Sequence, residues 1–106
     1  MTSPFLAIPR SEWLAANDLA FAVRDAFPVS PGHSLVVTRR VVATWFEATP
    51  EEQRAVLDLV GEVKLRLDRE YAPQGYNVGF NAGEAAGQTV PHLHATSPTH
   101  AAESVT

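Results

Sequence analysis

The sequence predicts a small α+β domain that combines several short strands with one long helix. A stripe of apolar residues at helical spacing runs through residues 50–71. Short apolar or alternating runs bounded by Gly, Pro and Asn elsewhere are typical of strands. A chain of 106 residues that is 45% hydrophobic can bury one modest core. We therefore expect one domain.

The elements can be placed in order along the chain. The expected strands cover residues 4–8, 12–16, 19–24, 34–38, 75–81 and 90–96. The helix is expected near residues 50–71, because Thr49 suits the N-cap, Pro50 the first helical position and Glu52 the capping box. Its apolar stripe, which we interpret as core or subunit packing, consists of Val56, Leu59, Val60, Val63 and Leu67. Ala72 and Pro73 end it, and Trp45 and Phe46 before it are interpreted as packing residues.

A His-x-His pattern stands in the last expected strand. Because alternate strand residues share a face, His92, His94 and Thr96 are predicted to lie on one side of the sheet. Two neighbouring imidazoles can act as a nucleophile and as its orienter or acid. The pair alone is equally compatible with a metal half-site or with structural histidines.

A glycine-rich polar stretch, residues 83–89, leads into the histidine strand. Glycines let backbone amides approach a ligand, and successive exposed amides form a site for an anion such as phosphate. A further histidine, His33, directly precedes the apolar run 34–38. Three histidines and the glycine loop could therefore meet at one site.

On these residues the chain resembles the histidine-triad (HIT) superfamily of nucleotidyl hydrolases and transferases. The likeness runs from about Ser3 to His94, through residues 17–37, which include Asp25 and His33, and residues 75–94. Several motifs in the right order are more specific than any one of them. The resemblance implies a HIT-like antiparallel sheet of about five strands, one long helix and a homodimer.

The resemblance also implies a role for each site residue. His94 would attack the α-phosphorus and form a nucleotidyl-histidine that water cleaves, with His92 orienting it and His33 holding its ring from the far side. The implied phosphate ligands are Asn81, Gly87, Gln88, Thr89 and Thr96. Asp25 would bind the ribose, and Phe5 and Ile8 the base, although a core role is as plausible for these two.

The chain departs from the family pattern at Thr96, which stands where the third histidine belongs. A threonine can donate a hydrogen bond but is no general acid, which would cost roughly a hundredfold in rate. Because the likeness stops after Ala95, we expect the domain to cover residues 1–96 and a polar, disordered or divergent tail to cover 97–106. His100 could replace the missing group only if the chain turns at Pro98.

No metal or other cofactor is expected. Many family members carry a Cys-x-x-Cys pair that helps to bind zinc, whereas the corresponding residues here are 3–6 and contain no cysteine. A histidine-only zinc site formed by His33, His92 and His94 is the alternative, as an artefact or an inhibited state. The absence of cysteine from the whole sequence excludes disulfides and thiol catalysis.

The expected function is hydrolysis or transfer at nucleoside 5′-phosphoramidates or dinucleoside polyphosphates. The activity could be reduced, because the third motif histidine is missing. A catalytically impaired nucleotide-binding module is the alternative, and a structural dimer with a vestigial pocket is a third reading. The expected partner is a purine nucleotide or nucleotide conjugate. A net charge of −4 provides no basic patch for a polynucleotide. No signal peptide or bilayer-spanning apolar run is apparent, so we expect a cytoplasmic protein without a membrane partner.

Overall fold

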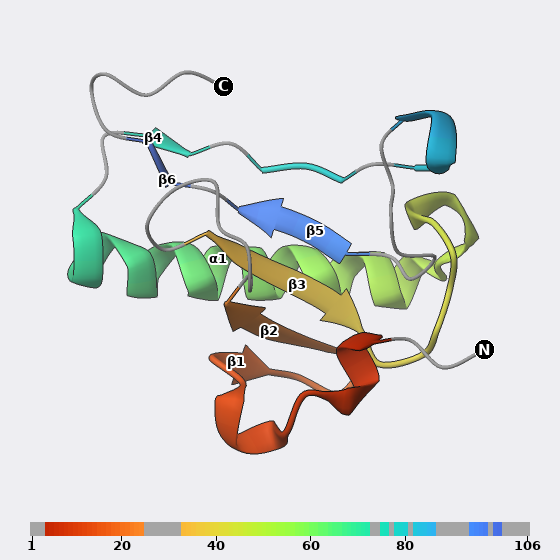
Figure 1. The fold of residues 1–106 in the computed structure, drawn as a ribbon, viewed down its shortest axis with the longest axis horizontal. Coiled ribbons are helices and arrows are strands. Elements are labelled where there is room, and N and C mark those ends of the chain that lie inside the picture. Colours follow the sequence, from red (N-terminus) through yellow and green to blue (C-terminus); the bar gives the residue numbers. More distant parts are fainter. Residues whose placement is uncertain are drawn as a thin grey trace.

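The computed structural model describes residues 4–24, 33–72, 75–76, 78–80, 82–86, 94–97 and 99–100. One long helix packs against an antiparallel sheet in the order β1-β2-β3-β5 (Figure 1). These strands are β1 (Ala15–Ala16), β2 (Ala20–Arg24), β3 (Ser34–Thr38) and β5 (His94–Ser97). A second, two-stranded sheet pairs β4 (Gly75–Tyr76) with β6 (Thr99–His100). The predicted α+β fold class is confirmed.

The helix α1 (Pro50–Tyr71) begins with the predicted capping box. The Glu52 amide donates to Thr49 Oγ1 at 3.1 Å, and the Thr49 amide donates to Glu52 Oε1 at 2.9 Å. The Arg40 guanidinium adds bonds to both Glu52 oxygens, at 2.7 and 3.1 Å. The helix ends at Ala72, which adopts a left-handed conformation with φ of 45°. The N-terminus of α1 is therefore tied to the segment that follows β3.

The apolar stripe of α1 faces the sheet. Val56, Leu59, Val63 and Leu67 are at most 1% exposed, and Val60 packs against them while remaining partly exposed. They contact Ala20 and Ala22 of β2 and Val36 of β3. The stripe thus forms the principal core, as the helical spacing predicts.

The opposite face of the sheet carries a second apolar cluster. Phe21, Val23, Leu35 and Val37 form it, and partly buried side chains from the N-terminal turns cover it: Phe5, Ile8 and Trp13. All five residues of β3 are buried. The central strand therefore has apolar neighbours on both sides, and the sheet lies between α1 and the N-terminal segment.

The strand predicted at residues 4–8 is wrong, and the strand predicted at residues 12–16 is confirmed only at its end. Residues 4–8 contain the 3-10 helix η1 (Pro4–Ala7), and residues 12–16 contain only the two-residue strand β1 after η2 (Arg10–Glu12). Pro4 and Pro9 lack amide hydrogens, so they disfavour a strand ladder here. The chain instead closes turns through the Ile8 amide to Phe5 O at 3.3 Å and the Trp13 amide to Arg10 O at 3.0 Å.

The remaining elements differ from prediction mainly in length. The predicted strands 19–24 and 34–38 correspond to β2 and β3, whereas β4 covers only the start of the predicted strand 75–81. β5 covers residues 94–97, and residues 90–93 lie outside the described part. Phe46 is 77% exposed and packs only with its ring edge-on to Phe80, with centroids 6.3 Å apart, so it is less buried than a packing role predicts. Trp45 does pack, stacked on Phe80 with ring centroids 4.9 Å apart.

The Arg40 contact predicts a pH-dependent contribution of Glu52 to stability. The hydrogen bond from Arg40 holds the pKa of Glu52 below its usual value of 4.5. A carboxylate whose pKa is lowered in the folded state contributes its full stabilisation of the fold above pH 4.5. The contribution is lost as the pH falls through the folded-state pKa. We expect Glu52→Gln to lower the free energy of unfolding by about 1–3 kcal/mol at pH 7 and by much less at pH 3.

Urea denaturation at the two pH values measures this difference. Glu62→Gln is the matched control, since Glu62 is an exposed acid on the same helix. An equal loss of stability at both pH values for Glu52→Gln would contradict the assignment.

Candidate functional site

The pairing of β3 with β5 fixes where two of the predicted site residues lie. His94 is opposite Val37, and Thr96 is opposite Leu35. Residues directly opposite each other in an antiparallel pair share one face of the sheet. Positions 94 and 96 therefore belong to the face that carries Leu35 and Val37, away from α1.

His33 directly precedes β3 and is only 7% exposed. The alternation of β3 places it on the face of Leu35. It is two residues from Leu35, the partner of Thr96, and four from Val37, the partner of His94. Four residues of strand span roughly 13 Å. The register thus places His33 closer to position 96 than to position 94, and the contact between the His33 and His94 rings remains a prediction.

Phe5 and Ile8 lie on the same side of the sheet as positions 94 and 96. Both pack against the Phe21, Val23, Leu35 and Val37 cluster. A hollow of about 270 Å³ adjoins Ile8, with a lining of Leu6, Ile8, Arg10, Trp13, Phe21 and Arg39. Both side chains thus take the core role, and of the two Ile8 also lines the hollow whereas Phe5 does not. The base-binding role of Phe5 and Ile8 stays a prediction.

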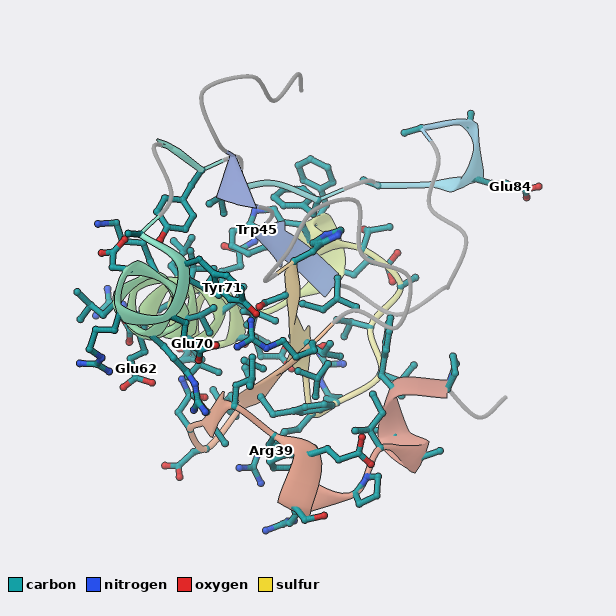
Figure 2. All side chains as sticks on the ribbon, turned by 60° about the vertical axis from the view of Figure 1, so that its left-hand side comes forward. Arg39, Trp45, Glu62, Glu70, Tyr71 and Glu84 are labelled. Atoms are coloured by element: carbon teal, nitrogen blue, oxygen red, sulfur yellow. The ribbon has the colours of Figure 1, made fainter. Side chains whose placement is uncertain are left out.

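The hollow has a cationic and aromatic wall. Trp13 stacks on Phe21 with centroids 4.4 Å apart, and the guanidinium carbons of Arg10 and Arg39 lie 5.1 and 5.2 Å from the Trp13 ring centroid. Arg39 lies beside the N-terminal turns in Figure 2. Two guanidinium groups favour an anionic ligand on this side of a chain whose net charge is −4.

Sequence reasoning missed this wall. One signal was available, because the alternation that puts Leu35 and Val37 on this face also puts Arg39 there. Trp13 had no comparable signal, since its stacking on Phe21 depends on the 3-10 turns that replace the expected strands.

The other predicted site residues lie outside the described part of the chain. They are His92, Asn81, Gly87, Gln88, Thr89 and Asp25. Among the residues that are described, no group of three or more His, Cys, Asp or Glu side chains is arranged to hold a metal ion. Of the helices in that same part, none is long and apolar enough to cross a membrane.

A larger open hollow, of about 450 Å³, lies elsewhere, between the β1–β2 turn and the first half of α1. Its lining includes Asp18, Glu51 and Asp58 against the single cation Arg54. This acidic lining repels a phosphate. We therefore assign the candidate site to the smaller hollow, which Ile8 lines, and to the face of the β3–β5 pair that carries positions 94 and 96.

Residues 9–95 match the HIT domain family, and the chain belongs to that family. An uncharacterized HIT-like protein of Mycoplasma pneumoniae is 40% identical over 78 residues, which are 74% of this chain and 54% of that protein. A bis(5′-nucleosyl)-tetraphosphatase (asymmetrical) of Schizosaccharomyces pombe is 36% identical over 76 residues, 72% of this chain and 42% of that protein. An AP-4-A phosphorylase of Mycobacterium tuberculosis is 33% identical over 97 residues, 86% and 50% of the two chains. The chain spans about half the length of these relatives.

Solved structures agree with the fold. A HIT family member from Bacillus subtilis superposes with a TM-score of 0.87 at 26% identity, over 97% of this chain and 76% of that one. A HIT-like protein from Bartonella henselae gives 0.86 at 25% identity, over 95% and 76%. The HIT-like arrangement of sheet and helix is therefore shared with crystal structures of the family.

The stack of Trp13 on Phe21 predicts an unequal response of two aromatic residues to truncation. Trp13→Ala removes a large side chain that covers the second cluster, and we expect it to lower the free energy of unfolding by about 2–4 kcal/mol. Phe46→Ala truncates a side chain that is 77% exposed, and we expect a loss below about 1 kcal/mol. Urea denaturation of both variants measures the difference, and equal losses would contradict this description of the wall.

Proposed function

We propose that the chain is a nucleotidyl hydrolase or transferase that uses His94 as its nucleophile. The substrate would be a dinucleoside polyphosphate or a nucleoside 5′-phosphoramidate, with the nucleotide held on the sheet face away from α1. Relatives named as a bis(5′-nucleosyl)-tetraphosphatase, an AP-4-A phosphorylase and a bis(5′-adenosyl)-triphosphatase support a dinucleoside polyphosphate.

The observation that carries the proposal is a row of three register positions across the sheet. Phe21 of β2 is opposite Val37 of β3, and Val37 is opposite His94 of β5. Two strand spacings separate the ends of this row by about 10 Å. A nucleoside 5′-monophosphate laid across β3 could thus place its base at the hollow beside Phe21 and Ile8, and its phosphorus at His94.

The chemistry would proceed in two displacements. An imidazole nitrogen of His94 attacks the α-phosphorus, the new N–P bond forms, and the bond to the leaving group breaks with its electron pair. Water then attacks the same phosphorus, which restores the free imidazole and releases the nucleoside monophosphate. His92 would orient His94, and His33 would act from the end of the face where position 96 lies.

The phosphate and ribose contacts are part of the same proposal. Asn81 and the segment 87–89 would donate hydrogen bonds to the phosphate oxygens as negative charge develops there. Asp25 would accept hydrogen bonds from the ribose hydroxyls. The Arg10 and Arg39 guanidinium groups make the neighbouring wall electropositive, which favours the approach of an anionic substrate.

Thr96 favours one substrate class over the other. A polyphosphate leaves as a stable anion and needs little proton donation, whereas the amine of a phosphoramidate must take up a proton as it leaves. Threonine provides a hydroxyl hydrogen bond but no general acid. A dinucleoside polyphosphate is therefore the better substrate for this chain, and the phosphoramidate should react slowly.

The proposal predicts that His94→Ala abolishes turnover without abolishing nucleotide binding. We expect the turnover of diadenosine tetraphosphate to fall at least about a thousandfold, because no second nucleophile replaces the imidazole. Calorimetry should still detect binding of adenosine monophosphate. His100→Ala is the control, since His100 lies in the β4–β6 pair opposite Gly75.

The outcomes separate the two candidate functions. Binding by the parent chain without turnover would favour a catalytically impaired nucleotide-binding module, for which Thr96 is the specific observation. Loss of turnover in His100→Ala would show that His100 supplies the missing acid.

Restoring the third motif histidine gives a separate prediction. We expect Thr96→His to raise turnover of adenosine 5′-phosphoramidate by up to about a hundredfold, and that of diadenosine tetraphosphate by much less. Initial rates on both substrates measure the ratio. Thr96→Val should leave the preference for the polyphosphate intact, and equal gains on both substrates in Thr96→His would contradict the role assigned to position 96.

A further inference from the structure

The side chains around the hollow beside Phe21 donate hydrogen bonds and do not accept them. The described lining consists of Leu6, Ile8, Arg10, Trp13, Phe21 and Arg39. Three of these side chains are purely apolar. An arginine guanidinium or a tryptophan indole provides N–H donors but no acceptor. The described lining therefore suits a ligand that presents hydrogen-bond acceptors.

Two of the donors are buried and have no hydrogen-bond partner in the part of the chain that the structure describes. They are Nε1 of Trp13 and Nε of Arg39. A buried N–H group without an acceptor destabilises a fold, so proteins seldom retain one without a reason. As whole residues, Trp13 and Arg39 are only partly buried. A small rotation of either side chain therefore turns its N–H group toward a ligand in the hollow.

The hollow suits a single nucleobase. Its volume of about 270 Å³ lies below the roughly 300–1,000 Å³ of pockets that bury a drug-sized ligand. Leu6, Ile8 and Phe21 offer apolar contacts to the faces of a flat ring, whereas a phosphate against them would lose its hydration. The inference below rests on the proposed function, which places the base here and the phosphorus at His94.

The purine bases differ in the edge that they present to such donors. Guanine and hypoxanthine carry two neighbouring acceptors, O6 and N7, whereas adenine carries the acceptor N7 beside the N6 amino donor. The planar fork of an arginine matches two neighbouring acceptors. Opposite adenine, one N–H group of the fork meets another donor and stays unpaired.

Arg39 is positioned to contact this edge. It follows β3 on the face of Leu35 and Val37, and its guanidinium carbon lies 5.2 Å from the Trp13 ring centroid. The contact with the indole restricts the guanidinium before a ligand arrives, which reduces the entropy lost on binding.

We propose that Arg39, supported by Trp13, determines the base specificity of this chain, and that the hollow binds the 6-oxopurines guanine and hypoxanthine more tightly than adenine. Adenosine nucleotides remain ligands, because the apolar walls contact the ring faces of either purine. Diguanosine tetraphosphate is then a better substrate than diadenosine tetraphosphate.

Calorimetric titration of the chain with GMP, IMP and AMP tests the base preference. We expect AMP to bind about tenfold more weakly than GMP, which is the discrimination typical of one bidentate arginine contact. IMP should bind about as well as GMP, because it keeps O6 and N7 and lacks only the N2 amino group. An AMP affinity equal to that of GMP overturns the proposal.

Two variants at Arg39 remove the same charge and differ in their hydrogen bonds. The amide of Arg39→Gln accepts from the adenine N6 amino group and donates to N7, so we expect the preference to shift toward AMP. Arg39→Met offers no hydrogen bond, so GMP binding should weaken about tenfold while AMP binding changes little. Arg54→Gln is the charge control, since Arg54 lines the separate hollow at α1, and it should keep the preference of the parent. Circular dichroism checks that each variant is folded.

The outcomes separate this inference from the proposed function. Equal weakening of GMP, IMP and AMP in Arg39→Met would place Arg39 on the phosphate, and it would overturn the inference while leaving the enzymatic function intact. An unchanged preference in Arg39→Gln would also overturn the inference. A guanine preference in a parent chain without turnover supports the inference and contradicts the enzymatic function. Failure of all three nucleotides to bind overturns both.

Discussion

The burial of β3 on both faces is the constraint on which the rest of the structure depends. Every residue from Ser34 to Thr38 is buried, and β3 pairs with β2 on one side and β5 on the other. Its alternation assigns Val36 to the helix side and Leu35 and Val37 to the opposite side. A shift of one residue in the β3–β5 register would move positions 94 and 96 to the helix side. The position of the predicted nucleophile therefore depends on the packing of β3.

The end of β3 also sets the position of α1. Thr38 Oγ1 donates to Arg40 O at 2.8 Å, and Arg40 in turn donates to the carboxylate of Glu52 in the first turn of the helix. The buried carboxylate of Glu52 thus accepts hydrogen bonds both from the Thr49 amide at the helix N-terminus and from the Arg40 guanidinium. At the other end of α1, Arg66 donates to Leu14 O at 2.9 Å, beside β1. Contacts at both ends fix the orientation of the helix about its own axis. This orientation keeps the apolar stripe on the sheet and leaves Leu57 and Leu65 exposed to solvent.

The sequence predicts best the elements whose signals are local. The capping box at Thr49, the stripe in α1 and the runs of β2 and β3 all depend on spacing within one segment, and the structure confirms them. The N-terminal turns could not be predicted in this way, because proline spacing and the stacking of Trp13 on Phe21 prevail over the strand propensity of residues 4–16. For the site, alternation within β5 predicts that positions 94 and 96 share one face of the sheet. Their position along the sheet relative to His33 depends on the β3–β5 register, which pairs strands some sixty residues apart in the chain and which no local pattern specifies.

The layered order of the molecule separates the candidate nucleotide face from α1. The candidate nucleotide face lies on one side of the sheet, and α1 lies on the other, with its apolar stripe packed against the sheet. Val36 connects the two layers, because its side chain packs on α1 while its neighbours Leu35 and Val37 pair with positions 96 and 94.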